Sequence, residues 1–490
     1  MTVESCFPLN PAQSRNLRNW AESERADRTI TVVVVPAGPV SSAQVRAAVV
    51  TLVARHRALR SRLAGGEQHV LAAPDLALTE CDGPPDHAPE RVDPAERALR
   101  GTVYVRGDRV AAVKLSLSHL FTDAFGAHAV VRELRLLLAG EALPPSPRQA
   151  GQGQAAEWRH TACWLDMLAA APRSITYSAV SREEQETARR ARVPLGPDDE
   201  DLLAEAVRRL GVTRYVLWAT AISALVSRLA GVHRQVFRST YANRFTAADF
   251  QVVDQLAQAV FVPIDGDAGD TLRVRAERIA TVSLRTLRRG HYDANELLRR
   301  LNEPARSRGA VFRPAFELNY VPPAPAESRG DGPPPPPGCD GVDVRIDPGA
   351  AKADLAVKVS HRPGPVLQLT ALRPVVRGPG ALAADCLAVL RTLATNPDAS
   401  IAELPLEPLP VTGLHAGHRS GALVDLDMTR RLVLSVPGVE TCELTPCGDR
   451  LTARVTTSAP VPDLPRALRA RQPWWSGTVV PDEVRISGSS

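Results

Sequence analysis

Short segments rich in β-branched residues alternate with helix patterns along most of the chain, and this alternation limits it to α/β architectures. A strand pattern at residues 29–38, TITVVVVPAG, is followed by an amphipathic helix pattern behind a serine cap. A second strand pattern at residues 109–120, RVAAVKLSLSHL, leads directly into the helix pattern FTDAFGAHAVVRELRLLLAG. A strand therefore turns into a helix between Ser118 and Ala124.

The alternation continues in the second half of the chain. Helix patterns are predicted at residues 197–212, 216–230, 271–287 and 381–395, and strand patterns at 234–241, 259–266, 312–321, 353–361 and 366–373. Residues 66–100 are rich in loop-forming residues. Residues 141–157 and 173–200 are polar, so we expect them to form the crossing between two halves of the main body.

These patterns divide the chain into four parts. We predict an N-terminal lobe at residues 1–172, a second lobe at 173–408 and a linker at 409–422. A small α+β module is predicted at 423–490, in the order helix, strand, turn, strand, helix, strand.

Composition excludes several kinds of partner. The 59 basic and 54 acidic residues leave a net charge of +5, and the basic residues form no dense stripe with interleaved aromatic residues, so we expect no nucleic-acid partner. No apolar window of about 18 residues and no signal peptide occurs, so we expect no membrane segment. The 7 cysteines lack paired spacing, which indicates a reducing cytoplasm rather than a disulfide framework.

Four residues near the C-terminal module carry the donor atoms that zinc prefers: His415, His418, Cys442 and Cys447. Their spacings match no known zinc module. We therefore predict no metal site.

The strand-to-helix junction carries the chemistry. His119 leaves the end of the strand, and Asp123 follows four residues later at the start of the helix. An imidazole has an ordinary pKa near 6.5, which suits a general base at neutral pH, although the spacing alone also fits a structural histidine. Asp123 has two interpretations: it orients His119, or it pairs with an arginine to hold the turn.

At this junction the chain resembles the condensation domain of nonribosomal peptide synthetases, which has an HHxxxDG signature at a strand-to-helix turn. Six further segments resemble that family's motifs in the same order. They are PLNPAQSRNL (8–17), RHRALRSRL (55–63), YANR (241–244), QAVFVPID (258–265), RGHYDANELLRRL (289–301) and FRPAFELNY (312–320).

The resemblance implies roles for individual residues. The second histidine of the signature, here His119, is assigned to catalysis. The aspartate, here Asp123, is structural and pairs with an arginine of the facing half, for which Arg244 is the matching residue. Ser118 stands where the family has its first histidine and Ala124 where it has glycine.

Further positions complete the predicted site. We expect Thr122, Ala124 and Asn319 to line the substrate channel; the alternative for Asn319 is a strand amide bonded to a neighbouring backbone group. Pro263 replaces the asparagine of the family's FVNT segment. The departures at Ser118, Ala124 and Pro263 leave open whether the site is fully active.

The resemblance also implies an architecture. The family has a chloramphenicol-acetyltransferase-like α/β fold, in which two lobes form a V-shaped pseudo-dimer with the catalytic histidine in the channel between them. The tail from 423 is similar to the small C-terminal subdomain of adenylation enzymes. That subdomain normally has a lysine that contacts the adenylate, and no lysine follows Lys358 here. We therefore expect no adenylate chemistry.

The function implied is that of a freestanding condensation enzyme of nonribosomal peptide or antibiotic biosynthesis. It would transfer an acyl or aminoacyl thioester from a carrier protein to an amine or hydroxyl, forming an amide or ester. No cofactor is expected to bind directly, because the phosphopantetheine of the carrier presents the substrate. The expected partners are a carrier protein that brings the acyl donor and a small-molecule amine or alcohol. A second carrier protein is expected where the acceptor is itself carrier-bound. Two alternatives stay open: a non-catalytic recruitment module and a coenzyme A-dependent O-acyltransferase.

Overall fold

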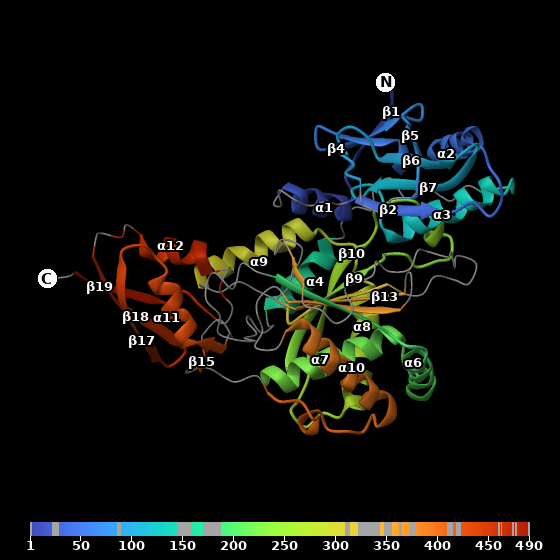
Figure 1. Cartoon of the computed structure of the whole chain (residues 1–490). Helices are drawn as coiled ribbons and strands as arrows, with labels where there is room; N and C mark the ends of the chain where they lie inside the picture. The colour runs from blue at the N-terminus through green and yellow to red at the C-terminus, as the bar shows by residue number, and fades with distance from the viewer. Residues whose placement is uncertain are drawn as a thin grey trace.

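The computed structural model shows two lobes, one above the other in Figure 1, and a C-terminal module beside them. The described residues are 2–21, 29–85, 90–145, 158–169, 188–308, 314–321, 344–346, 355–361, 365–371, 378–408, 415–417, 423–458, 461, 463–472, 475 and 478–488.

A four-stranded sheet and two helices form the body of the N-terminal lobe. Their bounds are β2 Thr29–Val34, α2 Ser42–Arg55, β5 Ala77–Asp82, β6 Leu99–Arg106, β7 Arg109–Ser118 and α3 Ala124–Leu138. The strand order is β2-β7-β6-β5. Apolar residues of α2, α3 and the sheet form one core. α2 begins where it does because Ser41 and Gln44 form a capping box.

A smaller sheet in the order β1-β4-β3 lies at the outer end of this lobe. It comprises β1 Val3–Pro8, β3 Ser61–Ala64 and β4 Glu67–Leu71, and α1 Pro11–Ala21 follows β1. The expectation of loops over residues 66–100 is therefore wrong, because β4, β5 and the start of β6 lie there. The sequence of β5, ALTECD, forms a largely exposed edge strand in which Leu78 packs against the core, so it has no clear apolar period.

The second lobe contains a seven-stranded sheet in the order β10-β9-β11-β13-β14-β8-β12. Its strands are β8 Ala188–Pro194, β9 Arg234–Tyr241, β10 Gln258–Asp265, β11 Glu317–Tyr320, β12 Val344–Ile346, β13 Leu355–Ser360 and β14 Val366–Ala371. Its helices are α4 Trp158–Ala169, α6 Pro197–Leu210, α7 Arg214–Ala230, α8 Leu272–Leu287, α9 Ala294–Arg308 and α10 Pro379–Thr395.

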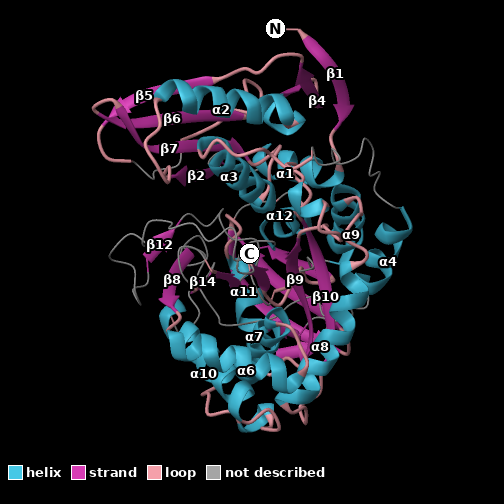
Figure 2. Cartoon of the chain, turned by 90° about the vertical axis from the view of Figure 1, so that its right-hand side faces the viewer, coloured by secondary structure: helices cyan, strands magenta, loops and turns pink. Residues whose placement is uncertain are grey.

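The two faces of this sheet are covered differently. Helices α6, α7, α8 and α10 share one large core with it (Figure 2). On the other face, Val236 of β9 and Phe261 of β10 pack in one core with residues from two helices. These are Trp164 of α4, Leu297 of α9 and Tyr292, which precedes α9. No described helix shares a core with β13, β14 or β8 on that second face.

Capping residues set the ends of α6 and α7. Gly211 and Gly231 end the two helices at φ +66°, in the left-handed conformation that glycine adopts at low cost. Thr213 caps the start of α7 by accepting from the Val216 N–H. Among the described residues, no single helix has the length and apolar character to cross a membrane, although α6 and α7, bent by 98°, pass together on length and composition.

β8 corrects a second expectation. Residues 173–200 were expected to be a polar crossing, yet Ala188–Pro194 form a strand between β14 and β12. In its sequence, ARRARVP, Ala191 and Val193 enter the core. The arginines around them make the apolar alternation of a strand difficult to recognise. The rest of the interval up to residue 187, and residues 146–157, lie outside the described residues.

Elements of the two lobes that contact each other include α1 with α9 and α3 with the short turn Asp249–Gln251. Both lobes consist of a mixed sheet covered by helices. The expected α/β architecture with two lobes is therefore confirmed.

The C-terminal module has its own core. After β15 His415–Gly417 and β16 Leu423–Asp425, it contains α11 Leu426–Leu434, β17 Val439–Cys447, β18 Arg450–Thr457, α12 Leu464–Arg471 and β19 Glu483–Gly488. The order from α11 onward is the predicted one, whereas β16 is a strand that the prediction lacked. Gly448 lies in the turn between β17 and β18 at φ +62°. Every residue of its main core lies in the module. Of the predicted linker 409–422, only β15 is described.

Because none of the described core residues of the module belongs to the lobes, we predict that a chain ending at Pro408 folds without it. The truncated chain is expected to unfold cooperatively within a few degrees of the lobes in the full chain, as calorimetry measures. A truncated chain that aggregates or melts without cooperativity would contradict this prediction.

Candidate functional site at the lobe junction

The site begins where β7 ends at Ser118. The Ser118 carbonyl accepts from the N–H groups of Phe121 and Thr122, both at 3.1 Å, and so closes a tight turn. Asp123 then caps α3, since its Oδ1 accepts from the Gly126 N–H at 2.9 Å. The short turn thus fixes the orientation of every side chain between strand and helix.

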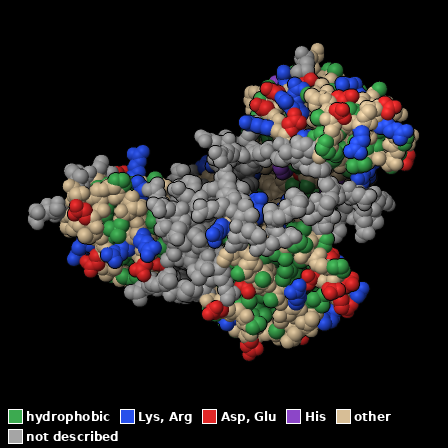
Figure 3. All heavy atoms as spheres, in the orientation of Figure 1, with side chains coloured by type: hydrophobic (Ala, Val, Ile, Leu, Met, Phe, Trp, Pro, Cys, Tyr) green, Lys and Arg blue, Asp and Glu red, His purple; other side chains and the backbone are tan. Residues whose placement is uncertain are grey.

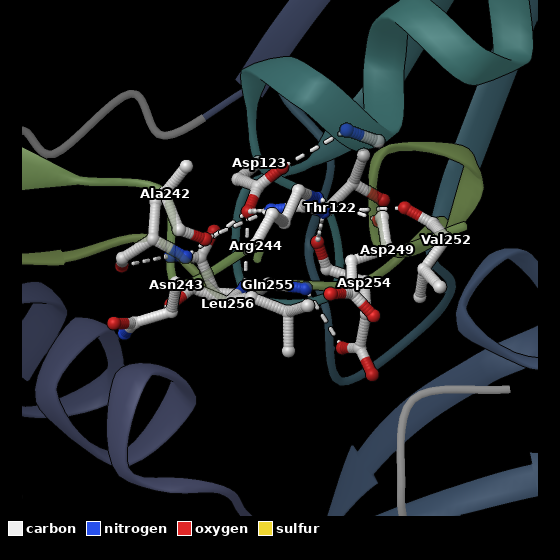
Figure 4. Close-up of polar contacts among 12 residues, drawn as sticks. Thr122, Asp123, Ala242, Asn243, Arg244, Asp249, Val252, Asp254, Gln255 and Leu256 are labelled. Carbon is white, nitrogen blue, oxygen red and sulfur yellow. Dashed lines mark hydrogen bonds and ion pairs between the residues drawn. The ribbon is translucent and has the colours of Figure 1, made fainter. Parts of the chain in front are cut away.

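The second carboxylate oxygen of Asp123 joins the two lobes (Figure 4). Arg244 Nη1 donates to Asp123 Oδ2 at 2.6 Å, and the N–H groups of Leu256 and Ala257 donate to the same oxygen at 3.0 Å each. Asp123 and Arg244 are only 1% and 3% exposed. Of the two interpretations of Asp123, pairing with an arginine is the one present.

Backbone carbonyls satisfy the rest of the Arg244 guanidinium. Nε donates to Asp249 O at 3.1 Å, and Nη2 donates to Val252 O and Asp254 O at 3.2 and 3.3 Å. The desolvation cost of burying a charge is largely offset when all of its hydrogen-bonding groups have partners. Arg244 therefore folds the segment 244–254 around itself.

This segment lies directly against the first turn of α3. The Asp123 N–H donates to Asp254 O at 3.2 Å, and a Cβ placed on Gly126 would lie 3.2 Å from Asp254 N. A larger residue than glycine at 126 would have to push the segment away. The close approach sets the segment 252–257 beside the residues that precede α3.

His119 is held by this crossing segment. Its Nδ1 lies 3.0 Å from the Thr122 carbonyl oxygen and 3.0 Å from Gln255 Oε1. Gln255 Nε2 in turn donates to Ala257 O at 2.9 Å, which fixes the amide with its oxygen toward the imidazole. Because both partners of Nδ1 are acceptors, Nδ1 carries the proton, and the neutral ring presents Nε2 as an acceptor.

The environment keeps that ring neutral. Burial lowers the pKa of His119 below its ordinary value, and the nearby Asp123 carboxylate offsets only part of this effect. His119 is nevertheless only half-buried as a residue, and no described residue hydrogen-bonds its Nε2. The space-filling view shows a hollow between the two lobes with a histidine side chain inside it (Figure 3).

The N-terminal part of α1 contacts the backbone of the site. Asn10 and Gln13 form reciprocal side-chain-to-backbone hydrogen bonds of 2.9 Å around Pro11. The helix that follows carries Asn16, whose amide donates to the His119 carbonyl at 3.1 Å. This contact ties the PLNPAQ segment to the junction.

Asp254 adds a second titratable group beside the site. Burial raises its pKa to about 7, although Oδ1 accepts from the Gln255 N–H at 2.7 Å. Gln13 Nε2 also donates to this oxygen, at 3.4 Å.

The remaining predicted residues lie in different environments. Thr122 is fully buried and contributes its carbonyl rather than its side chain, whereas Ala124 is exposed at the first position of α3. Asn319 lies on β11 of the second lobe, on the sheet face turned away from the large core, and no hydrogen bond of its side chain is found among the described residues. Pro263 is half-buried in β10.

Sequence reasoning missed Gln255, Asp254 and Asn16. Gln255 is 136 positions away from His119 in the sequence, in a segment without helical or strand period. No local pattern marks such a contact. Among the described residues, no group of three His, Cys, Asp or Glu side chains has the arrangement of a metal site, and His418 lies outside the described part.

We predict that Asp123→Ala lowers the melting temperature more than His119→Ala. The first change leaves the buried Arg244 guanidinium without a carboxylate and removes the cap of α3, at a cost of roughly 3–5 kcal/mol. The second removes a ring that is partly solvated. Asp123→Asn, which keeps the size and one carbonyl oxygen, serves as the control. Equal or reversed shifts in thermal unfolding would contradict this account.

Comparisons with known proteins were made in sequence and in structure. No protein-family model matches the chain. A probable non-canonical nonribosomal peptide synthetase, CymA of Salinispora arenicola, is 22% identical over 399 residues, which cover 73% of this chain and 5% of that protein. The chain thus spans only a small part of the curated relative that it matches.

Solved structures give the stronger likeness. The condensation domain of the monacolin K polyketide synthase MokA matches with a TM-score of 0.65 at 14% identity, over 82% of this chain and 100% of the other. The first condensation domain of the CDA synthetase matches at 0.57 and 17%, over 82% and 100%. The X-domain of teicoplanin biosynthesis, solved in complex with OxyB, matches at 0.58 and 17%, over 82% and 96%. The two lobes of this chain therefore have the fold of the nonribosomal peptide synthetase condensation domains.

Proposed function

We propose that the chain is a condensation-type acyltransferase of natural-product biosynthesis, which moves an acyl or aminoacyl group from a carrier-bound thioester to an amine or hydroxyl. One observation carries the proposal: His119 is partly exposed at the junction of the lobes, with Nδ1 donating to fixed acceptors and Nε2 free of described partners. This is the tautomer and orientation that a general base requires.

The chemistry follows from that arrangement. The nitrogen lone pair of a neutral amine attacks the thioester carbonyl carbon, and the N–H proton passes to His119 Nε2. The tetrahedral intermediate then collapses and the C–S bond breaks. The departing sulphur takes the proton from His119 Nε2, which gives the pantetheine thiol and returns the imidazole to its neutral form. The products are an amide and a free thiol. A hydroxyl acceptor gives an ester by the same steps.

In this proposal, groups of the protein position the catalytic imidazole, and no cofactor takes part. Thr122 and Gln255 hold the ring, while the Asp123–Arg244 pair holds the turn that carries it. Holding the reacting groups at the correct separation accounts for much of the acceleration in reactions of this kind. The substrate arrives on the phosphopantetheine of a carrier protein, which is the chemistry that the condensation-domain fold accommodates.

A recruitment role is the second candidate. The structural similarity to the teicoplanin X-domain, which was solved with OxyB bound, favours it, as do Ser118 and Ala124 in place of the signature histidine and glycine. In this version the site binds a carrier and a tailoring enzyme without making a bond.

Intact-mass measurement of loaded carrier proteins distinguishes the candidates. Carriers loaded with candidate acyl groups are mixed with the protein and candidate amines, and the masses of carrier and product are followed. Transfer from a carrier supports the proposal. Transfer from acyl-coenzyme A alone identifies a carrier-independent enzyme, and tight carrier binding without any transfer identifies a recruitment module.

We predict that His119→Ala lowers turnover by at least about a hundredfold, because a positioned general base contributes roughly 10²–10⁴-fold. Carrier binding and the melting temperature are expected to change little. His233→Ala is the matched control, since His233 is a half-buried histidine outside the junction. Wild-type turnover in His119→Ala would remove the imidazole from the mechanism.

We also predict that Gln255→Glu shifts the pH dependence of turnover. In the wild type, burial lowers the pKa of His119, so activity should fall only when the pH drops below the ordinary histidine value near 6.5. A carboxylate at position 255 would favour the charged ring and raise that pKa, which moves the acidic limb of the profile to higher pH. An unshifted limb in kcat against pH would show that Gln255 does not act through His119.

A further inference from the structure

Three basic side chains that form no ion pair with a described residue project from two strands of the seven-stranded sheet that flank β14. Arg190 and Arg192 lie on β8, and Lys358 lies on β13. In the strand between them, Gln368 of β14 is the register partner of both Lys358 and Arg192. Arg190, Arg192 and Lys358 together are called the basic cluster below.

All three side chains project from the same face of the sheet. Ala191 and Val193 enter the large core with the helices, so the alternating Arg190 and Arg192 point to the opposite face. The same alternation places Lys358 on that opposite face. Figure 2 shows β8 and β14 on the side of the second lobe that is turned toward β2 and β7 of the first.

The spacing of the strands brings the three charges within reach of one ligand. Strands lie about 4.8 Å apart, so the Cα atoms of Lys358 and Arg192, two strands apart, are separated by about 10 Å, while Arg190 and Arg192 on one strand are about 7 Å apart. Long flexible side chains can close such distances around one oxyanion. Asn319, which we expect in the substrate channel, is the register partner of Lys358.

No described carboxylate neutralises the basic cluster. None of its three side chains forms an ion pair or a side-chain hydrogen bond with a described residue, and Arg190 Nε is buried without a partner. Another arginine of the same sheet does have an ion-pair partner: Arg238 on β9 pairs with Glu317 at 3.5 Å. Arg244 and Arg275, the most buried arginines described, also have carboxylate partners.

The charges of the cluster repel one another, and this repulsion adds to the effect of burial on the pKa values of Lys358 and Arg190. Burial, followed by the charges of Arg192 and Arg190, lowers the pKa of Lys358. Burial and Arg192 lower the pKa of Arg190. Keeping like charges together and partly desolvated costs free energy, and a bound anion would remove that cost.

We propose that the basic cluster binds an oxyanion of the condensation substrate, either a carboxylate of the acyl or acceptor group or the phosphate of the arm that carries it. This inference rests on the proposed function for the identity of its ligand. It assigns the enzyme a preference for anionic substrates, through side chains that lie on the second lobe and away from the strand-to-helix junction.

Binding measurements test the proposal without any bond formation. Three pantetheine analogues are compared by calorimetry, each with the thioester sulphur replaced by NH so that no transfer occurs. One carries a succinyl group, which ends in a carboxylate; the second carries its neutral carboxamide counterpart; the third is the phosphorylated form of the second. We expect the wild type to bind the first or the third about tenfold more tightly than the second, as a charge-assisted pair predicts.

The variants show whether the cluster causes this preference. Arg192→Gln and Lys358→Gln are expected to reduce it to less than twofold. Arg189→Gln is the matched control, because Arg189 is next to Arg190 on β8 but points to the other face of the sheet. The two cluster variants are expected to melt at or above the wild-type temperature, since each relieves repulsion, so a loss of preference would not reflect unfolding.

Each outcome decides the proposal. Preference for the succinyl analogue identifies a substrate carboxylate as the ligand, and preference for the phosphorylated analogue identifies the carrier arm. A wild type that binds the three equally or binds none, or a preference that survives both cluster variants, overturns the proposal. Charge preference without transfer to any amine would refute the condensation function alone, and transfer without charge preference would refute the basic cluster alone.

Discussion

The buried pair of Asp123 and Arg244 is the contact on which the site depends. One carboxylate caps α3 with Oδ1 and accepts from Arg244 and two backbone N–H groups with Oδ2. The strand-to-helix turn belongs to the N-terminal lobe, while Arg244 and its segment belong to the second. Burying these charges is favourable only because nearly every donor has an acceptor. The relative position of the lobes and the orientation of His119 therefore follow from the same set of bonds.

Local periods located the turn that carries His119 and Asp123, and the resemblance to the condensation domain assigned roles to these residues and to Arg244. A strand period that stops at Ser118 and a helix period that starts at Ala124 leave a short turn, and a turn of that length restricts where His119 and Asp123 can point. The arginine came from a matching motif, YANR, rather than from any physical signal. Strong periods likewise located α7, α8, β9 and β10 close to their observed bounds.

Other parts of the site are determined only by tertiary structure. Gln255 reaches His119 because Arg244 folds the intervening chain around its guanidinium, and neither the composition nor the period of residues 245–257 indicates that path. Asn16 reaches the His119 carbonyl because α1 is capped by Asn10 and Gln13 at the right place. Such contacts between distant residues leave no local pattern, so a single sequence cannot reveal them.

The strand β8 could not be recognised from the sequence because of the arginines that also form part of the proposed anion site. A strand with one buried face usually alternates apolar and polar residues, and Ala191 and Val193 keep that alternation. Arginines at 189, 190 and 192 dominate the composition and suggest a solvated loop. A strand in a sheet holds its side chains more rigidly than a loop does, so Arg190 and Arg192, which pair with no described carboxylate, stay close together even though they repel. Local features that conflict with ordinary strand composition are expected where function rather than stability selects the residue.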